Sequence, residues 1–282
     1  MKFVTRFSFS VVLVVVLVPF LNAQQRSASS AAATTSAVSQ SDAPDSCAHL
    51  FTSGASSSNT FIQYCVTDVG AITSIQTPFG HFHIGPGGEG YGLCQESPAV
   101  EYHDYAATWS DNWNFPQIVS KSNSAIKISR TTSDGNWTLV QTISKVAATG
   151  SIKVVMALTN NQNVDKVAYL IRFADVDIDG ITDGEGEAAG ASLQSAWAWH
   201  DDPSSAFHYG LQLENTGKMP FSYQQGFVRL APTGPNACDF AEFSQPYGFY
   251  FTGSQNLSIV YAYVGAVASH QTLTVTMTYR GT

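Results

Sequence analysis

The stretch WTLVQTISKVAATGSIKVVMALTNNQNVDKVAYLIRFADVD, residues 137–177, decides the fold of this chain. It contains three runs rich in β-branched and aromatic residues, and the last two are separated by the polar turn NQNV, residues 161–164. Such runs favour β-strands over helices. The segments KVVMALT and VAYLIRF are apolar on both strand faces, which is typical of strands buried between two layers. The stretch therefore predicts the interior of a layered β structure.

Strand signals continue on both sides of this stretch. The run AIKISRTT, residues 125–132, leads through Asp134 and Gly135 into the first run, and Asp-Gly between alternating runs indicates a hairpin. In HQTLTVTMTYR, residues 270–280, apolar residues alternate with threonines, so one face should be buried and the other wet. One segment shows helical periodicity, GEAAGASLQSAWAW at residues 186–199. Its two glycines lower its helix propensity. The expected fold is all-β, a large antiparallel β-sandwich with few or no helices.

The stretch 137–177 resembles the central sheet of galactose-mutarotase-like supersandwich domains, where a strand, an Asn-rich turn and another strand recur. The resemblance implies a supersandwich-like architecture. In the mutarotases the strand after such a turn carries a catalytic His. Here the matching residues, LIRFADVDIDG, contain Asp and no His, so the resemblance carries over architecture and no chemistry.

The first 46 residues predict export rather than structure. Lys2 and Arg6 precede the apolar run VVLVVVLVPFL, which ends at Asn22 and Ala23, the pattern of a secretory signal peptide at residues 1–23. Residues 24–46 are rich in Ser, Ala and Thr and predict a disordered tether. A single β-sandwich domain is then expected at residues 47–282. We expect a secreted protein, extracellular or periplasmic, with no membrane span after signal cleavage.

The charge of the chain excludes one class of partner. Its 13 basic and 21 acidic residues give a net charge of -8, which becomes -10 when the signal peptide is removed. Such a chain repels nucleic acid, so no nucleic-acid partner is expected. The segment GPGGEG, residues 85–90, spells a dinucleotide fingerprint but lacks the strand-to-helix context. We read it as a flexible loop and expect no nucleotide cofactor.

Four cysteines remain after processing, an even number that suits an oxidising compartment. Three pairings are open for Cys47, Cys65, Cys94 and Cys238. We favour Cys47 with Cys65, which flank a short segment, and Cys94 with Cys238, which both lie in loop-like contexts. Zinc ligation is disfavoured because no CxxC motif exists.

An acidic segment follows the third run of the opening stretch. If the chain stays extended, Asp175, Asp177 and Asp179 lie on one face, and with Asp183 they spell the beginning of a calcium loop. The twelfth position is Gly186, so this is not an EF-hand. Calcium is the expected cofactor, held by these four aspartates where the strand reaches open solvent. A solvated acidic loop and a catalytic role remain as alternatives.

Two groups of aromatic residues beside polar side chains suit sugar rings, because C–H faces stack on aromatic faces and hydroxyls take hydrogen bonds. The predicted sugar contacts are Tyr102, Tyr105, Trp109, Trp113, Trp197 and Trp199. If the protein is an enzyme, Glu101, His103, His200 and Asp201 are the predicted acid/base residues. The alternative is that these aromatics pack the core. His81 and His83 are two residues apart and therefore lie on one strand face, where they could bind a transition metal. The alternative is that they are half-exposed strand residues with no metal.

Three functions therefore stay open. The first is non-catalytic binding at the cell exterior, of carbohydrate or another cell-surface component, by a sandwich with a calcium-stabilised loop. The second is a carbohydrate-active enzyme, an epimerase, lyase or hydrolase. The third is a structural envelope or matrix protein.

Overall fold

The computed structural model of the chain describes residues 47–105, 109–180, 187–200, 208–218, 223–231, 233–239, 250–253 and 257–282. These residues all fall in one compact unit, Asp42–Thr282. The predicted signal peptide and tether lie outside the described residues. Within the described part of the chain, no helix has the length and apolar character needed to cross a membrane.

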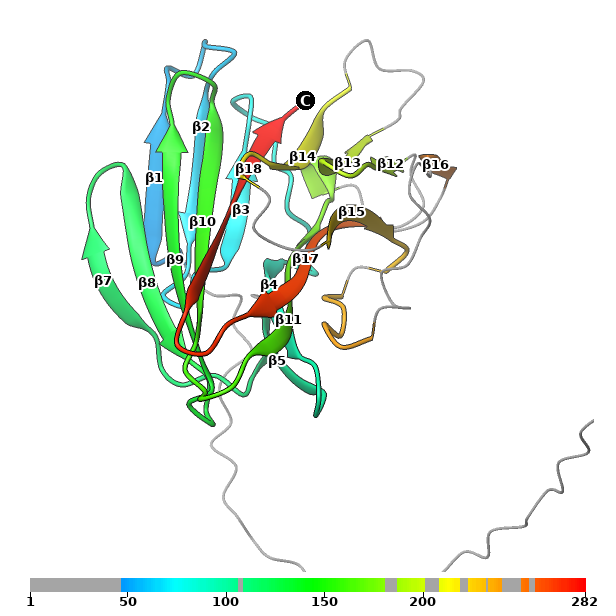
Figure 1. Ribbon diagram of the computed structural model, residues 1–282. Helices are drawn as coiled ribbons and strands as arrows, with labels where there is room; N and C mark the ends of the chain where they lie inside the picture. The colour runs from blue at the N-terminus through cyan, green and yellow to red at the C-terminus, as the bar shows by residue number, and fades with distance from the viewer. Residues whose placement is uncertain are drawn as a thin grey trace, which may run out of the picture. The chain divides into compact units, whose positions relative to one another are not determined.

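Three antiparallel sheets make up the fold (Figure 1). The largest has nine strands, in the spatial order β16 (Tyr250–Gly253), β12 (Glu187–Ala191), β13 (Ser195–His200), β14 (Gly210–Asn215), β18 (Thr272–Gly281), β10 (Ser151–Asn160), β9 (Trp137–Val146), β8 (Ala125–Thr131) and β7 (Gln117–Lys121). The C-terminal strand β18 thus lies between β10 and β14 and joins the two halves of this sheet (Figure 1).

Two smaller sheets complete the layers. The six-stranded sheet has the order β15 (Tyr223–Arg229), β17 (Ser258–Val267), β11 (Lys166–Asp175), β4 (Glu89–Gln95), β5 (Val100–Tyr105) and β6 (Trp109–Asp111). The three-stranded sheet has the order β1 (His49–Ser53), β2 (Ile62–Val66) and β3 (Ile72–Gln76). The helical content of the described residues is the single 3-10 turn Ile178–Gly180. The predicted all-β antiparallel sandwich is confirmed.

Alternating residues of the strands build the main core between the sheets. Met156 of β10 and Met277 of β18 point inward from the nine-stranded sheet, Leu170 of β11 from the six-stranded sheet, and Tyr64 of β2 from the three-stranded sheet; all four have no exposed surface. The side chains of a strand alternate between its two faces. The neighbours of these inward-pointing residues on each strand therefore point to the outer face of their sheet.

A second core covers the other face of the six-stranded sheet. Ile171 and Phe173 of β11 point away from the main core and pack with Phe227, Val260 and Ala237. The six-stranded sheet is thus buried on both faces, which explains the two-sided apolar pattern of VAYLIRF. One disulfide ties this layer together, because Cys94 of β4 bonds to Cys238 beside Ala237.

The structure confirms several local predictions and corrects two. Cys47 bonds to Cys65 and Cys94 to Cys238, as expected, and both disulfides fit an oxidising compartment. The hairpin at Asp134 and Gly135 joins β8 to β9, with Gly135 at a φ of 76° that suits glycine.

The helical candidate at residues 186–199 is wrong: its described part forms β12 and β13, because Ala189, Ala196 and Ala198 pack inward at strand spacing. The reading of GPGGEG as a flexible loop is wrong for its end, since β4 begins at Glu89, which is fully buried.

Candidate functional site

A pocket of about 550 Å³ opens on the outer face of the nine-stranded sheet, near the C-terminus of the chain. It is lined by Trp197, Trp199, His208, Gln212 and Thr282. Two half-buried indole rings thus share one hollow with an imidazole, an amide and a hydroxyl. An aromatic surface with a few polar groups is the composition of a small-molecule site.

Strand alternation directs both tryptophans into this pocket. Ala196 and Ala198 of β13 are buried in the main core, so Trp197 and Trp199 point outward. Gly190 on β12 lies directly across from Trp197. A Cβ at Gly190 would lie 2.6 Å from Cζ2 of Trp197, so the indole extends over the backbone of that glycine.

The neighbouring strand supplies a second glycine beside Trp199. Gly210 of β14 is paired with Trp199, and a Cβ there would lie 2.5 Å from the Thr282 hydroxyl and 2.8 Å from the Trp199 Cβ. The lack of a side chain at Gly210 lets Thr282 and Trp199 lie close together. The two glycines therefore make the space in which the aromatic surface of the pocket forms.

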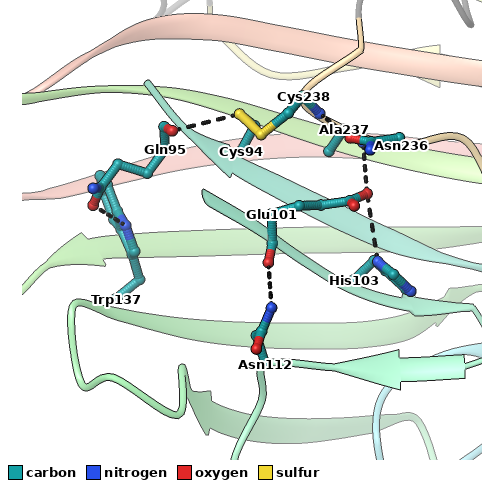
Figure 2. The surroundings of a disulfide bond; sticks show 9 residues. All are labelled: Cys94, Gln95, Glu101, His103, Asn112, Trp137, Asn236, Ala237 and Cys238. Atoms are coloured by element: carbon teal, nitrogen blue, oxygen red, sulfur yellow. Dashed lines mark hydrogen bonds and ion pairs between the residues drawn. A yellow bond between two sulfur atoms is a disulfide. The ribbon is translucent and has the colours of Figure 1, made fainter. Parts of the chain in front are cut away.

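The predicted acid/base residues Glu101 and His103 meet on β5, beside the disulfide Cys94–Cys238 (Figure 2). Oε1 of Glu101 lies 3.4 Å from Nδ1 of His103 and accepts a hydrogen bond from the Ala237 amide at 2.8 Å. About a fifth of each side chain is exposed, 22% for Glu101 and 21% for His103. The disulfide holds residue 237 in place and so helps to fix the Glu101 carboxylate.

The other two predicted acid/base residues are not part of this pair. His200 is the last residue of β13, in the nine-stranded sheet, and accepts at its carbonyl a hydrogen bond from Nδ1 of His208 at 3.3 Å. Asp201 lies outside the described residues. Glu101 and His103 belong to the six-stranded sheet, so the three acid/base candidates that the structure describes lie on two different sheets.

Two aromatic residues of the first predicted sugar site, Tyr102 and Tyr105, belong to the interior. Tyr102 and Tyr105 are 1% and 3% exposed, and their hydroxyls donate to Asp134 at 2.6 Å and to the Pro235 carbonyl at 2.7 Å. Trp113 packs edge-on against Tyr102, with its ring centre 6.1 Å away. The side chain of Trp109 lies outside the description, although its backbone belongs to β6. The ring faces of Tyr102 and Tyr105 are thus not available to a surface ligand.

Two of the predicted calcium ligands are more buried than expected, whereas Asp179 is exposed. Asp175 is fully buried and Asp177 is 1% exposed, which corrects the expectation that the strand carries them into open solvent. Strand β11 ends at Asp175, and Val176 and Ile178 join the main core on the opposite side. Asp183 lies outside the described residues.

The two buried carboxylates are close neighbours. A Cβ built at Gly85 would lie 2.2 Å from Oδ2 of Asp177 and 2.6 Å from Oδ2 of Asp175, so these oxygens are no more than about 5 Å apart. Oδ2 of Asp175 also accepts from the Gly87 amide at 2.7 Å. Within the described ranges, no group of three or more His, Cys, Asp or Glu residues could hold a metal ion.

Asp179 has a different partner, which the sequence pattern did not reveal. Its Oδ2 accepts a hydrogen bond from Nδ1 of His81 at 2.7 Å, and the His81 ring stacks on Tyr209 with centroids 3.7 Å apart. His83 is fully buried and donates from Nε2 to the Thr77 carbonyl. Burial lowers the pKa of His83 to about 4. No local signal joins residues 81 and 179, because they are 98 positions apart.

Comparisons with known proteins show the fold. No protein-family model matches the chain, and no curated protein matches its sequence significantly. A bacterial glucoamylase solved in complex with acarbose superposes with a TM-score of 0.56 over 85% of this chain, at 9% identity. The chain covers 32% of the length of that glucoamylase.

Galactose mutarotase-like proteins are also among the similar structures, as the pattern of residues 137–177 implied. A putative aldose 1-epimerase from Escherichia coli K12 matches over 83% of this chain and 99% of its own, with a TM-score of 0.48 and 12% identity. A galactose mutarotase-like protein from Lactobacillus casei matches over 83% of this chain and 100% of its own, with a TM-score of 0.48 and 8% identity. At such identities and TM-scores the likeness says nothing about activity.

Proposed function

We propose that this protein binds carbohydrate in the pocket on the outer face of the nine-stranded sheet. The observation that carries the proposal is the pair of half-buried indole rings, Trp197 and Trp199, which line one hollow with His208, Gln212 and Thr282. In this site a sugar ring stacks on the indole faces. The polar groups then take hydrogen bonds from its hydroxyls.

The chemistry of the pocket supports this class of ligand. Aromatic rings attract the C–H face of a sugar by dispersion and by their negative π-face. Gln212 offers an amide donor and acceptor, and Thr282 a hydroxyl that both donates and accepts. A purely apolar ligand would leave the Thr282 hydroxyl and the N–H groups of the Gln212 amide without a partner on the ligand, which is costly where water is displaced. A ligand with one apolar face and a rim of hydroxyls satisfies both kinds of surface.

The fold agrees with the proposal without deciding it. The glucoamylase that shares the fold was solved in complex with acarbose, and this chain spans 32% of its length. In this proposal the protein is exported, with residues 1–23 removed as a signal peptide. Mass spectrometry of the secreted protein tests this cleavage: its N-terminal peptide should begin directly after residue 23.

Carbohydrate binding is tested on a glycan array, followed by calorimetry with the glycans retained. Replacing Trp197 with Ala should weaken binding by about 30-fold, since a stacked Trp contributes about 2 kcal/mol. The control is Trp113→Phe, which changes a half-buried aromatic residue outside the pocket that packs against Tyr91 and Tyr102. If the array retains nothing, or if Trp197→Ala binds as well as the wild type, the proposal fails.

A second candidate function is catalysis on a carbohydrate, and the Glu101–His103 pair favours it. A carboxylate 3.4 Å from an imidazole forms a unit that can accept and return a proton. Here Glu101 would orient His103, while the Ala237 amide holds the carboxylate. The reaction would be an epimerisation, elimination or hydrolysis of a sugar.

Incubating the secreted protein with polysaccharides and analysing the soluble products tests this second candidate. Product release that Glu101→Gln abolishes, while glycan retention persists, establishes an enzyme. If the wild type and the variant both retain glycans and release no products, catalysis is excluded and only the binding function remains.

A further inference from the structure

A second hollow of about 330 Å³ lies on the same outer face, next to the tryptophan pocket. It is lined by residues of β9, β10, β14 and β18 and by the turns that join them. On β14, Gln212 lines the first hollow and Glu214 the second. At the end of the chain, Thr282, which follows β18, lines the first hollow, and Arg280 of β18 lines the second. The two hollows therefore share their wall.

One cross-strand row runs through both hollows. Trp197 of β13 is paired with Gln212 of β14, Gln212 with Arg280 of β18, and Arg280 with Ser151 of β10. Neighbouring strands are about 4.8 Å apart, so the row spans roughly 14 Å from Trp197 to Ser151. Arg280 Nη2 donates to Oε1 of Gln212 at 3.0 Å, which links the two hollows at their boundary. A single sugar ring does not fill a site of this length.

The second hollow is rich in hydroxyls. Ser151, Thr276 and Thr278 line it, together with Thr149 and Thr216. Their side chains make hydrogen bonds among themselves, such as Thr216 to Thr278 at 3.0 Å, and each hydroxyl keeps further donor or acceptor capacity. This surface suits a chain of polar groups rather than an apolar ligand.

The charge of the second hollow is opposite to that of the protein. The chain carries a net charge of -8, yet the described residues that line the second hollow include two basic side chains, Lys153 and Arg280, and one acidic side chain, Glu214. Arg280 is paired with Glu214 at 3.3 Å. Lys153 is exposed, and within the described residues its ammonium makes no hydrogen bond or ion pair. Lys153 thus brings to the hollow an ammonium group that forms no ion pair with Glu214, the acidic residue of the same lining, whose partner is Arg280.

We propose that the natural ligand is an extended acidic polysaccharide, which crosses the sheet with one sugar stacked on Trp197 and the carboxylate of a later sugar at Lys153 and Arg280. This inference rests on the proposed carbohydrate-binding function and specifies its ligand. The tryptophans supply affinity for sugar rings of any kind. Lys153 and Arg280 select chains that carry carboxylates, and the length of the row selects several linked sugars.

The test compares oligosaccharides of two and six sugars in neutral and acidic forms, with oligogalacturonates and their methyl esters as the matched pair. Isothermal calorimetry should show the acidic hexamer binding at least tenfold more tightly than its methyl ester and than the acidic dimer. Lys153→Met should weaken binding of the acidic hexamer by about three- to tenfold, the range of an exposed to a partly desolvated charge contact. Glu214→Gln should strengthen that binding, since it removes the acidic group beside Arg280.

The matched control is Lys127→Met, because Lys127 is an exposed lysine of β8 in the same sheet but outside both hollows. That variant loses the same charge and should bind the acidic hexamer as the wild type does. Equal binding of neutral and acidic hexamers, with both still weakened by Trp197→Ala, would overturn the acidic ligand and leave the carbohydrate function standing. Binding of no oligosaccharide at all would overturn both.

Discussion

Arg172 and Glu89 form a fully buried ion pair at the centre of the fold, and neither side chain has any exposed surface. Arg172 of β11 contacts both carboxylate oxygens, and Nη2 donates to Oε2 at 2.9 Å. Glu89 of β4 also accepts from the Tyr279 hydroxyl of β18 at 2.8 Å and from the Ile72 amide of β3 at 2.7 Å. The pair thus connects all three sheets. Burial alone would lower the pKa of Arg172, but the Glu89 carboxylate raises it above its usual value.

Removing one partner of this pair should be strongly destabilising. We expect Arg172→Met to lower the free energy of unfolding by about 3 to 5 kcal/mol, because it leaves the Glu89 carboxylate buried without its counter-charge. Urea denaturation measures the loss. Asp68→Asn, which breaks an exposed contact with His49, should cost less than about 1 kcal/mol. Losses of equal size in the two variants would contradict a structural role for the buried pair.

The two disulfides should contribute unequally to stability. Cys94–Cys238 closes a sequence separation of 144 residues, and Cys47–Cys65 one of 18. Loop-closure entropy then predicts about 5 kcal/mol for the first and about 3 kcal/mol for the second. Urea unfolding of the paired alanine variants, Cys94→Ala with Cys238→Ala and Cys47→Ala with Cys65→Ala, measures both. A larger loss from the shorter loop would show that residual structure in the unfolded chain dominates.

Stability should fall in mild acid because of His83. In the unfolded chain this histidine takes up a proton near pH 6.5, whereas burial lowers its pKa in the folded protein to about 4. The unfolded state therefore binds more protons between these pH values, and stability decreases as the pH is lowered from about 6.5 to about 4. The loss should reach about 3 kcal/mol. His83→Asn, measured by urea unfolding at several pH values, should show a shallower decrease; an unchanged slope would refute this role.

Local patterns in the sequence predicted the strands because each strand carries its own signal. The alternation in residues 137–177 and 270–280 reflects burial of every second side chain, and the Asp134-Gly135 dipeptide specifies its hairpin by itself. In the same way, the spacing of Trp197 and Trp199 puts both rings on one strand face. These features depend on neighbours in the chain, which a sequence displays directly.

The rest of the site depends on register between distant segments. Gln212 and Thr282 join Trp197 and Trp199 because β14 lies between β13 and β18, an order that no local pattern specifies. Glu89 seemed to belong to a glycine-rich loop, and its burial follows from Arg172, which is 83 residues away. Asp175 and Asp177 were expected in open solvent because an acidic run usually is. The segment around Gly85, which covers Asp175 and Asp177, comes from a remote part of the chain.

We predict that calcium stabilises the protein through Asp175 and Asp177 of the predicted calcium loop. Their Oδ2 atoms lie within about 5 Å of each other in a buried site, where like charges repel strongly and a divalent cation would reverse that repulsion. At calcium concentrations about 100-fold above the dissociation constant, stability should rise by about 2.7 kcal/mol. For a domain of this size that corresponds to a rise in melting temperature of about 5 to 10 °C. Thermal unfolding of metal-free protein titrated with calcium measures it.

The variant Asp177→Asn should abolish the calcium-dependent rise, while Asp68→Asn, an exposed carboxylate elsewhere, should retain it. A melting temperature that stays constant up to millimolar calcium would exclude the calcium loop. The acidic segment would then have a purely structural role.

Gly190 should control carbohydrate binding although it does not line the pocket. A Cβ at this position would lie 2.6 Å from Cζ2 and 2.7 Å from Cε2 of Trp197, so Gly190→Ala must push the indole away from its strand. We expect this variant to bind glycans about five- to tenfold more weakly, which corresponds to about 1 kcal/mol. In the Trp197→Ala background the same change should have no further effect, because the displaced ring is already gone. Calorimetry of the wild type, the two single variants and the double variant measures the coupling between Gly190 and Trp197. Additive losses of binding free energy would mean that Gly190 acts on the sheet and not through Trp197.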